Sequence, residues 1–347
     1  MYGAAPGQPF GYGTSGGASG IYYTNYSNPH LTTTLVKTKP FPYSNTVGFP
    51  LIPNSGIGFG NSIGNIAFDY ANKQLFATNL EDGRIYRINP ATGFVLSIFD
   101  PFSLDIGTAD PGMAPAGEQL WGIGVLTKAG ITSVYFARTT TIGKEIWSIP
   151  LTASGEFNAT AAGGGLYTDI AVTATKKEIA PVPGISSKIT DIAFSSTGRM
   201  LLAERGHPHS AKVFEYILLG STWVVGNNFY VGAVAGGLNS AGGVDFNNRE
   251  VLNSTPNFIC NDIAWASGNA METIKHPYTG ISPNPYPRLV YGVQGMSSSG
   301  NSSTLINNKL TDLYIDYNCT GDVLNHQSNV KGKIGDIEFF DATCPCK

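Results

Sequence analysis

The chain has 347 residues, of which 13% are charged, and its 24 acidic and 21 basic side chains leave a net charge of −3. A chain this weakly charged and slightly acidic lacks the basic surface that neutralises phosphates, so we expect no nucleic-acid partner. The longest apolar stretch, residues 217–225, is interrupted at 220–222 and is far shorter than the roughly 20 residues of a membrane-spanning helix, so we expect no membrane insertion.

Residues 1–30 are predicted to form a glycine-rich N-terminal arm. The beginning, MYGAAPGQPFGYGTSGGASG, is of low complexity and has no periodic apolar pattern, which indicates a flexible leader with aromatic residues that could anchor it to a neighbour. Residues 11–16 match G-x-G-x-x-G, but no strand precedes them and no helix follows, so the match does not predict dinucleotide binding. The arm lacks the basic and apolar segments of a signal peptide, so we expect either earlier removal of such a leader or export by another route.

Glycine and proline are so frequent, at 43 and 21 residues, that few stretches suit a helix, and the fold is predicted to be all-β. One strand opening recurs: a small or polar residue, then Asp, Asn or Gly, then Ile or Leu, then alternating small and large residues. Small residues in these openings, such as Ala67, Ala193 and Ala264, suit strands that crowd together near a central axis, as the inner strands of a β-propeller do. The openings, counting a looser one at 242, begin at residues 64, 121, 168, 190, 242, 261, 311 and 335.

The clearest repeat covers residues 64–98, where four short strands are separated by turn sequences. Residues 121–157 and 188–223 repeat the pattern. Four strands in about 35 residues are typical of a propeller blade, so residues 31–343 are predicted to form a β-propeller of four-stranded blades. Because some openings are only 22 residues apart, blade boundaries are hard to place, and we expect six or seven blades, with five as the alternative.

The last opening, 335–340, comes too late in the chain to begin a blade. We expect it to complete a blade begun near residues 32–39, because a closed ring hides the edge strands of its sheets. After it comes a short Cys-Pro-Cys tail at 344–347.

All four cysteines lie in the last third of the chain, at Cys260, Cys319, Cys344 and Cys346. A bond between the last two would close a small strained ring, so we expect disulfides from this pair back to the first two. Free thiols and a zinc site with His326, or with His207 and His209, are the alternatives, although paired Cys-x-x-Cys spacing is absent.

The densest group of titratable residues is in the loop after a predicted second strand. Glu204, Arg205, His207 and His209 are the candidate binding residues there, because loops at one face of a propeller commonly carry function. The alternative is that the two charged residues pair with neighbours and the histidines are solvated. The sequence contains no G-x-S-x-G, H-E-x-x-H, P-loop or EF-hand motif.

Aspartates recur at the strand openings, and Asp69, Asp191 and Asp262 are the candidate ligands of a calcium ion, with Asp312 and Asp336 in equivalent positions. Carboxylate oxygens suit a hard cation such as calcium. However, a side chain repeated in every blade equally suits the capping of turns. Apart from this possible calcium, no cofactor is expected.

Segments 261–270, 289–296 and 333–338 resemble the β-propeller-like region of large bacterial secreted cell-surface proteins of the adhesin type. The resemblance implies an extracellular or cell-surface location and a role in recognition or assembly, and it supplies no catalytic residue.

Two functions are therefore expected from the sequence. The first is a non-enzymatic extracellular propeller for adhesion, glycan or protein recognition, or self-assembly into a surface structure or filament, with copies of itself, surface proteins or glycans as partners. The second is a metal-dependent propeller hydrolase acting on a lactone or ester.

Overall fold

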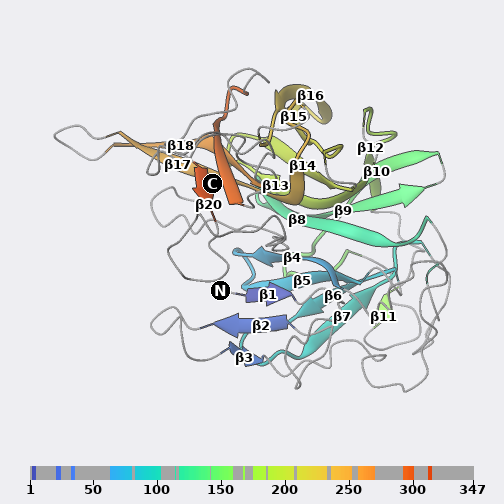
Figure 1. Cartoon of the computed structure of the whole chain (residues 1–347). Helices are drawn as coiled ribbons and strands as arrows, with labels where there is room; N and C mark the ends of the chain where they lie inside the picture. The colour runs from blue at the N-terminus through green and yellow to red at the C-terminus, as the bar shows by residue number, and fades with distance from the viewer. Residues whose placement is uncertain are drawn as a thin grey trace. The chain divides into compact units, whose positions relative to one another are not determined.

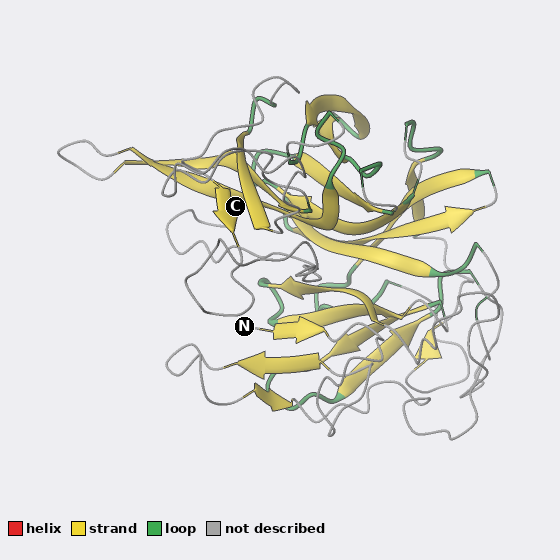
Figure 2. Ribbon diagram, viewed as in Figure 1, coloured by secondary structure: helices red, strands yellow, loops and turns green. Residues whose placement is uncertain are grey.

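A computed structural model of the chain consists of strands joined by turns and loops, and the residues that it describes include no helix (Figure 2). The prediction of an all-β fold is therefore confirmed. The described residues are 2–4, 21–24, 33–35, 63–79, 83–102, 114, 117–140, 142–158, 167–168, 175–184, 187–206, 209–232, 236–251, 257–269, 292–300 and 312–314. Within these ranges no helix is long and apolar enough to cross a membrane.

The chain divides into two compact units, Met1–Val182 and Pro183–Lys347. Each contains two antiparallel sheets with the strand order of propeller blades, and the first unit also contains a three-stranded sheet. The described strands thus have the β-propeller fold, with four blades, two in each unit, which we number in chain order (Figure 1).

Blade 1 has the strands predicted for residues 64–98: β4 (Ile63–Asp69), β5 (Gln74–Asn79), β6 (Arg84–Ile88) and β7 (Val95–Phe99). The turn between β6 and β7 forms because Asn89 accepts hydrogen bonds from the backbone of Ala91 and Thr92 through its side chain. Gly93 closes this turn at φ 73°, a conformation that glycine adopts without a steric penalty.

Blade 2 consists of β8 (Leu120–Lys128), β9 (Ile131–Thr140), β10 (Gly143–Pro150) and an outer strand, β12 (Lys176–Ile179). The prediction ended this blade at residue 157, and that boundary is wrong. After β10 the chain makes a tight turn, closed by a single bridge between Leu151 and Phe157, and the outer strand comes later. The opening at 168 is not the start of a blade either, because β11 (Tyr167–Thr168) pairs in parallel with β7 of blade 1.

The two faces of blade 1 are buried against different partners because its side chains alternate along each strand. One face, with Phe76, Ile85 and Phe99, forms an apolar core with blade 2 residues such as Phe136. The other face, with Leu75, Tyr86 and Ile98, includes Ile21 in its core.

Ile21 belongs to the three-stranded sheet of β1 (Tyr2–Ala4), β2 (Ile21–Thr24) and β3 (Thr33–Leu35), and it is 1% exposed. The described part of residues 1–30 is therefore strand, and Ile21 packs in the core of its own chain. The N-terminal partner predicted for the closing strand, residues 32–39, includes β3, which pairs with β2. The closing strand itself, 335–340, and the tail lie outside the described residues.

The second unit contains blade 3, formed by β13 (Lys188–Phe194), β14 (Arg199–Arg205), β15 (Val213–Leu219) and β16 (Thr222–Phe229). Blade 4 follows with β17 (Ser240–Val251), β18 (Asn257–Gly268), β19 (Gly292–Ser297) and β20 (Asp312–Tyr314). Apolar residues of both blades, among them Leu201, Val213, Phe246 and Ala264, form one core.

The predicted number of blades, six or seven with five as alternative, is wrong. The openings at 64, 121, 190 and 242 lie in the first strands of the four blades. Those at 261 and 311 lie in β18 and β20, which are the second and fourth strands of blade 4. The opening pattern is typical of a strand that is buried on both faces. The sequence of such a strand is similar whether it is the first strand of a blade or a later one.

Candidate functional site

The predicted loop site begins at Glu204, near the end of β14, and this side chain is fully buried. Its carboxylate accepts hydrogen bonds from the backbone nitrogens of Ser187 and, at 3.1 Å, of Lys212. Glu204 therefore ties the segment before β13 to the start of β15, which is a structural role. Arg205, the last residue of β14, is partly buried, and His207 lies outside the described residues.

His209 contacts a different partner, Asn239, with 2.6 Å between its Nδ1 and the amide Oδ1. The amide orientation follows from the second contact of Asn239, whose Nδ2 donates to the carbonyl of Val231 at 2.9 Å. Because Oδ1 can only accept, Nδ1 of His209 is the donor of this hydrogen bond. The structure thus orients one predicted histidine, and Glu204 and His209 each contact other residues, Ser187 and Lys212 for the first and Asn239 for the second.

The acidic residues at the strand openings act as caps where their side chains are described. Asp69 accepts hydrogen bonds from the backbone of Ala71 and Asn72 in the turn after β4. Asp191 accepts from its neighbour Ile192 and from Val244, both at 2.7 Å, and so joins β13 to β17. These contacts are those of the capping alternative.

Asp262 and Asp312 lie in β18 and β20, but their side chains are outside the described set, as is all of Asp336. Among the residues that the structure describes, no three His, Cys, Asp or Glu side chains are grouped as a metal site would require. Cys260 lies in β18 without a described side chain, and the other three cysteines lie outside the description, so the predicted disulfides stay a prediction.

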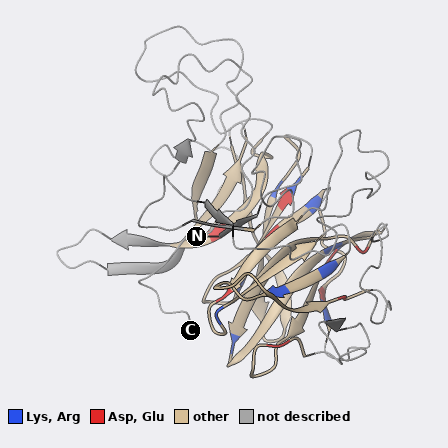
Figure 3. Ribbon diagram, turned by 90° about the horizontal axis from the view of Figure 1, so that it is seen from below, with Lys and Arg blue, Asp and Glu red and all other residues tan. Residues whose placement is uncertain are grey.

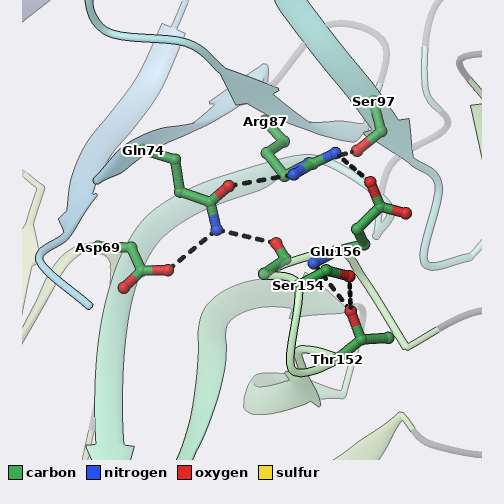
Figure 4. A network of polar contacts seen from close by, with 8 residues as sticks. Asp69, Gln74, Arg87, Ser97, Thr152, Ser154 and Glu156 are labelled. Atoms are coloured by element: carbon green, nitrogen blue, oxygen red, sulfur yellow. Dashed lines mark hydrogen bonds and ion pairs between the residues drawn. The ribbon is translucent and has the colours of Figure 1, made fainter. Parts of the chain in front are cut away.

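A larger polar network surrounds Asp69 and is shown in Figure 4. The Nε2 atom of Gln74 donates to Asp69 at 2.9 Å and to the carbonyl of Gly155 at 2.8 Å. Arg87 donates to Gln74 through Nη1, pairs with Glu156 through Nη2 at 2.9 Å, and donates to a serine hydroxyl through Nε. Every nitrogen of this guanidinium has a partner, so the network fastens the turn after β10 to blade 1.

A different arrangement of aromatic and charged side chains lies where the core between blades 1 and 2 reaches the surface. We call it the Arg138 platform, and its members are Phe102, Arg138, Glu145, Trp147 and Lys177. Register places the last four on one face of blade 2, since Arg138 is opposite Glu145, and Trp147 is opposite Lys177. Phe102 follows β7. Asp100 fixes the position of its backbone, because the Asp100 side chain accepts a hydrogen bond from the backbone nitrogen of Phe102.

The rings and cations of the platform are stacked. Phe102 and Trp147 meet edge to face with centroids 5.4 Å apart. The guanidinium carbon of Arg138 lies 3.9 Å from the Phe102 centroid, and Nζ of Lys177 lies 5.0 Å from that of Trp147. Both distances are within the range of cation–π attraction.

Glu145 is the acceptor at the centre of the platform, and its side chain is only 7% exposed. It accepts hydrogen bonds from Lys177 at 3.0 Å and from the Trp147 indole at 2.8 Å. Burial alone would raise the pKa of Glu145, but these two hydrogen bonds and the charges of Lys177 and Arg138 together hold it below its ordinary value. Glu145 is thus ionised at neutral pH.

The guanidinium of Arg138 donates fewer hydrogen bonds within the described residues than its nitrogen atoms allow. Its Nε donates to the carbonyl of Gly117 at 2.5 Å, but Nη1 lies 3.7 Å from Glu145, beyond hydrogen-bond distance. Within the described residues neither Nη atom donates a hydrogen bond, and 23% of the side chain is exposed. Arg199 of blade 3 differs, because it also lies over a ring, that of Phe246, yet its Nη2 contacts both Glu215 and the carbonyl of Ser298.

Sequence reasoning missed the Arg138 platform because its members come from four segments of the chain. The signal that was available is alternation: Phe136 and Arg138 share a face of β9, as Glu145 and Trp147 share a face of β10. The register of β12, which supplies Lys177, could not be found without recognising that strand.

Comparison with protein-family models gives no match, and comparison with curated proteins gives none either. Among solved structures, the chain is similar to Kuenenia stuttgartiensis hydrazine synthase, with 7% identity and a TM-score of 0.36 over 81% of this chain and 57% of that one. It is similar to an N-acetylgalactosamine deacetylase from F. plautii, in complex with blood group B trisaccharide, with 9% identity and a TM-score of 0.37 over 68% and 66%.

A third similar structure is a nidogen/laminin complex, with 11% identity and a TM-score of 0.34 over 85% of this chain and 87% of that one. The chain spans less than two thirds of the length of the hydrazine synthase and deacetylase chains. At these identities and TM-scores none of the three carries an argument about the function of this chain.

Proposed function

We propose that this chain is a non-catalytic recognition domain, extracellular or at the cell surface, and that it binds its partner through the Arg138 platform. The observation that carries the proposal is the guanidinium of Arg138, which lies on an aromatic ring and whose two Nη atoms donate no hydrogen bond within the described residues, Nη1 lying 3.7 Å from Glu145. Arginine and aromatic side chains together are typical of the residues that contribute most to binding at interfaces.

The acidic side chains favour binding over hydrolysis as the function. A metal-dependent hydrolase needs carboxylates directed at a cation or at substrate. The oxygens of Asp69, Asp191 and Glu204 instead accept hydrogen bonds from the backbone of their own chain. Their contribution is to hold turns and strands together.

The test is binding of the purified chain to a panel of immobilised glycans and extracellular-matrix proteins, with wild type compared to Arg138→Ala. We expect wild type to retain at least one class of partner and Arg138→Ala to lose it while still unfolding in a cooperative thermal transition. Absence of binding to the whole panel, or metal-dependent turnover of lactones or esters by wild type, would contradict the proposal.

A further inference from the structure

We infer that the Arg138 platform recognises a carboxylate carried on a sugar ring, the chemistry of a hexuronate. This inference rests on the proposed function and names the class of ligand.

The first argument is the balance of charge. Two cations, Arg138 and Lys177, share one carboxylate, that of Glu145, so the platform carries one positive charge in excess. In Figure 3 the positions of Lys, Arg, Asp and Glu colour short stretches of the described ribbon, and most of it is uncharged. A single excess charge suits a ligand with one anionic group for each contact, whereas a nucleic acid or a polyphosphate requires several cations together.

The second argument is the geometry of Arg138. Stacking on Phe102 and the hydrogen bond from Nε to Gly117 fix the plane of the guanidinium. Its Nη1 and Nη2 then form a fork that matches the two oxygens of a carboxylate in a bidentate contact. Since the fork is already oriented, binding costs little side-chain entropy.

The third argument is the apolar surface beside the fork. The indole nitrogen of Trp147 is used by Glu145, so the exposed part of this ring and of Phe102 offers only carbon surface. A hexuronate combines both features, because its carboxylate is attached directly to a pyranose ring with apolar C–H edges. A peptide would also seek backbone partners, and of the platform strands β9 and β10 are paired on both sides, whereas the outer strand β12 is paired with β10 alone among the described strands.

The test is calorimetric titration of the full chain with an oligogalacturonate, its methyl ester, a neutral oligosaccharide of the same length and an acidic peptide. We expect the oligogalacturonate to bind and each of the others to bind about tenfold more weakly or not at all. Arg138→Ala is expected to lose about tenfold in affinity, and Arg138→Lys nearly as much, because lysine keeps the charge without the fork.

The matched control is Lys128→Ala, which removes the same charge from the same blade. Lys128 is exposed at the hairpin end of β8, opposite Ile131, whereas Arg138 pairs with Leu120 at the other end. Its affinity should stay within about twofold of wild type, since an exposed charge at that separation is largely screened by salt.

The outcomes separate the two proposals. Equal binding of the acid and its methyl ester would overturn carboxylate recognition while leaving a glycan-binding domain. Binding of the acidic peptide alone would overturn the sugar. If the folded wild-type chain binds none of these four ligands, the inference is overturned, and the proposed function is then decided by the glycan and protein panel.

Discussion

At the scale of single residues, the clearest electrostatic prediction concerns Glu145. Its pKa in the folded chain is below the ordinary value of 4.5, so the unfolded chain binds more protons between the two pKa values and stability rises with pH there. The stabilisation is fully present above the ordinary pKa and is lost as the pH falls through the folded-state pKa.

We therefore expect Glu145→Gln to lower the free energy of unfolding by about 1 kcal/mol at pH 7, a small value because its partner Lys177 is 46% exposed. Urea denaturation at pH 7 and at pH 3 measures the difference. The gap between wild type and variant should narrow at the acidic pH, and a gap that widens there would contradict the assigned ion pairs.

A second residue-scale prediction concerns Asp191. Replacing it with Asn keeps one acceptor oxygen but puts an amide donor against one of the two backbone nitrogens, that of Ile192 or of Val244, so we expect a loss of about 2 kcal/mol in the free energy of unfolding. We also expect addition of calcium or EDTA to leave the thermal midpoint of both proteins unchanged, because a cation would have to displace those donors. A calcium-dependent rise in the midpoint of wild type that is absent from Asp191→Asn would instead identify Asp191 as a calcium ligand.

At the scale of single elements, the turn of the β8–β9 hairpin contains a residue, Ala129, whose replacement should stabilise the fold. Ala129 and Gly130 have φ values of 49° and 78°, which is the conformation of a two-residue turn that favours Asn-Gly. Alanine pays a steric penalty there, so Ala129→Asn should raise the free energy of unfolding by about 0.5 to 1 kcal/mol. Chemical denaturation measures the change, and Ala129→Val, which should be destabilising, is the control. A destabilised Ala129→Asn variant would show that the turn has another conformation.

The individual elements also show what could be read from the sequence. All four strands of blade 1 were predicted to within a residue or two, because polar turn sequences such as the one from Asn89 to Gly93 separate short apolar runs. Blade 4 was misread, because its second strand repeats the pattern of a first strand at 261. The outer strand β12, with the sequence KKEI, has no apolar pattern that would predict it.

The candidate site also depends on strand pairing that the sequence pattern does not predict. Clustering in sequence favoured Glu204 and its neighbours, but a buried carboxylate near backbone nitrogens is used as a cap. The Arg138 platform depends on cross-strand neighbours from β9, β10 and β12 and on the turn that aims Phe102, and such neighbours follow only from register.

At the scale of the whole molecule, the N-terminal sheet is part of the fold of the first unit. Ile21→Asp would place a charge in the apolar core beside Leu75 and Tyr86, so we expect a loss of about 3 kcal/mol or more in the free energy of unfolding. Ile131→Asp is the control, because that side chain is 58% exposed and the change there should cost less than about 0.5 kcal/mol. Equal stability of the two variants would show that residues 21–24 are not packed on blade 1.

The most direct test of the Arg138 platform as the binding site is a crystal structure of the chain soaked with a short oligogalacturonate. The account predicts a carboxylate within hydrogen-bond distance of both Nη atoms of Arg138, with its sugar ring against Trp147 or Phe102. Sugar density at another surface, with the platform unchanged, would contradict it.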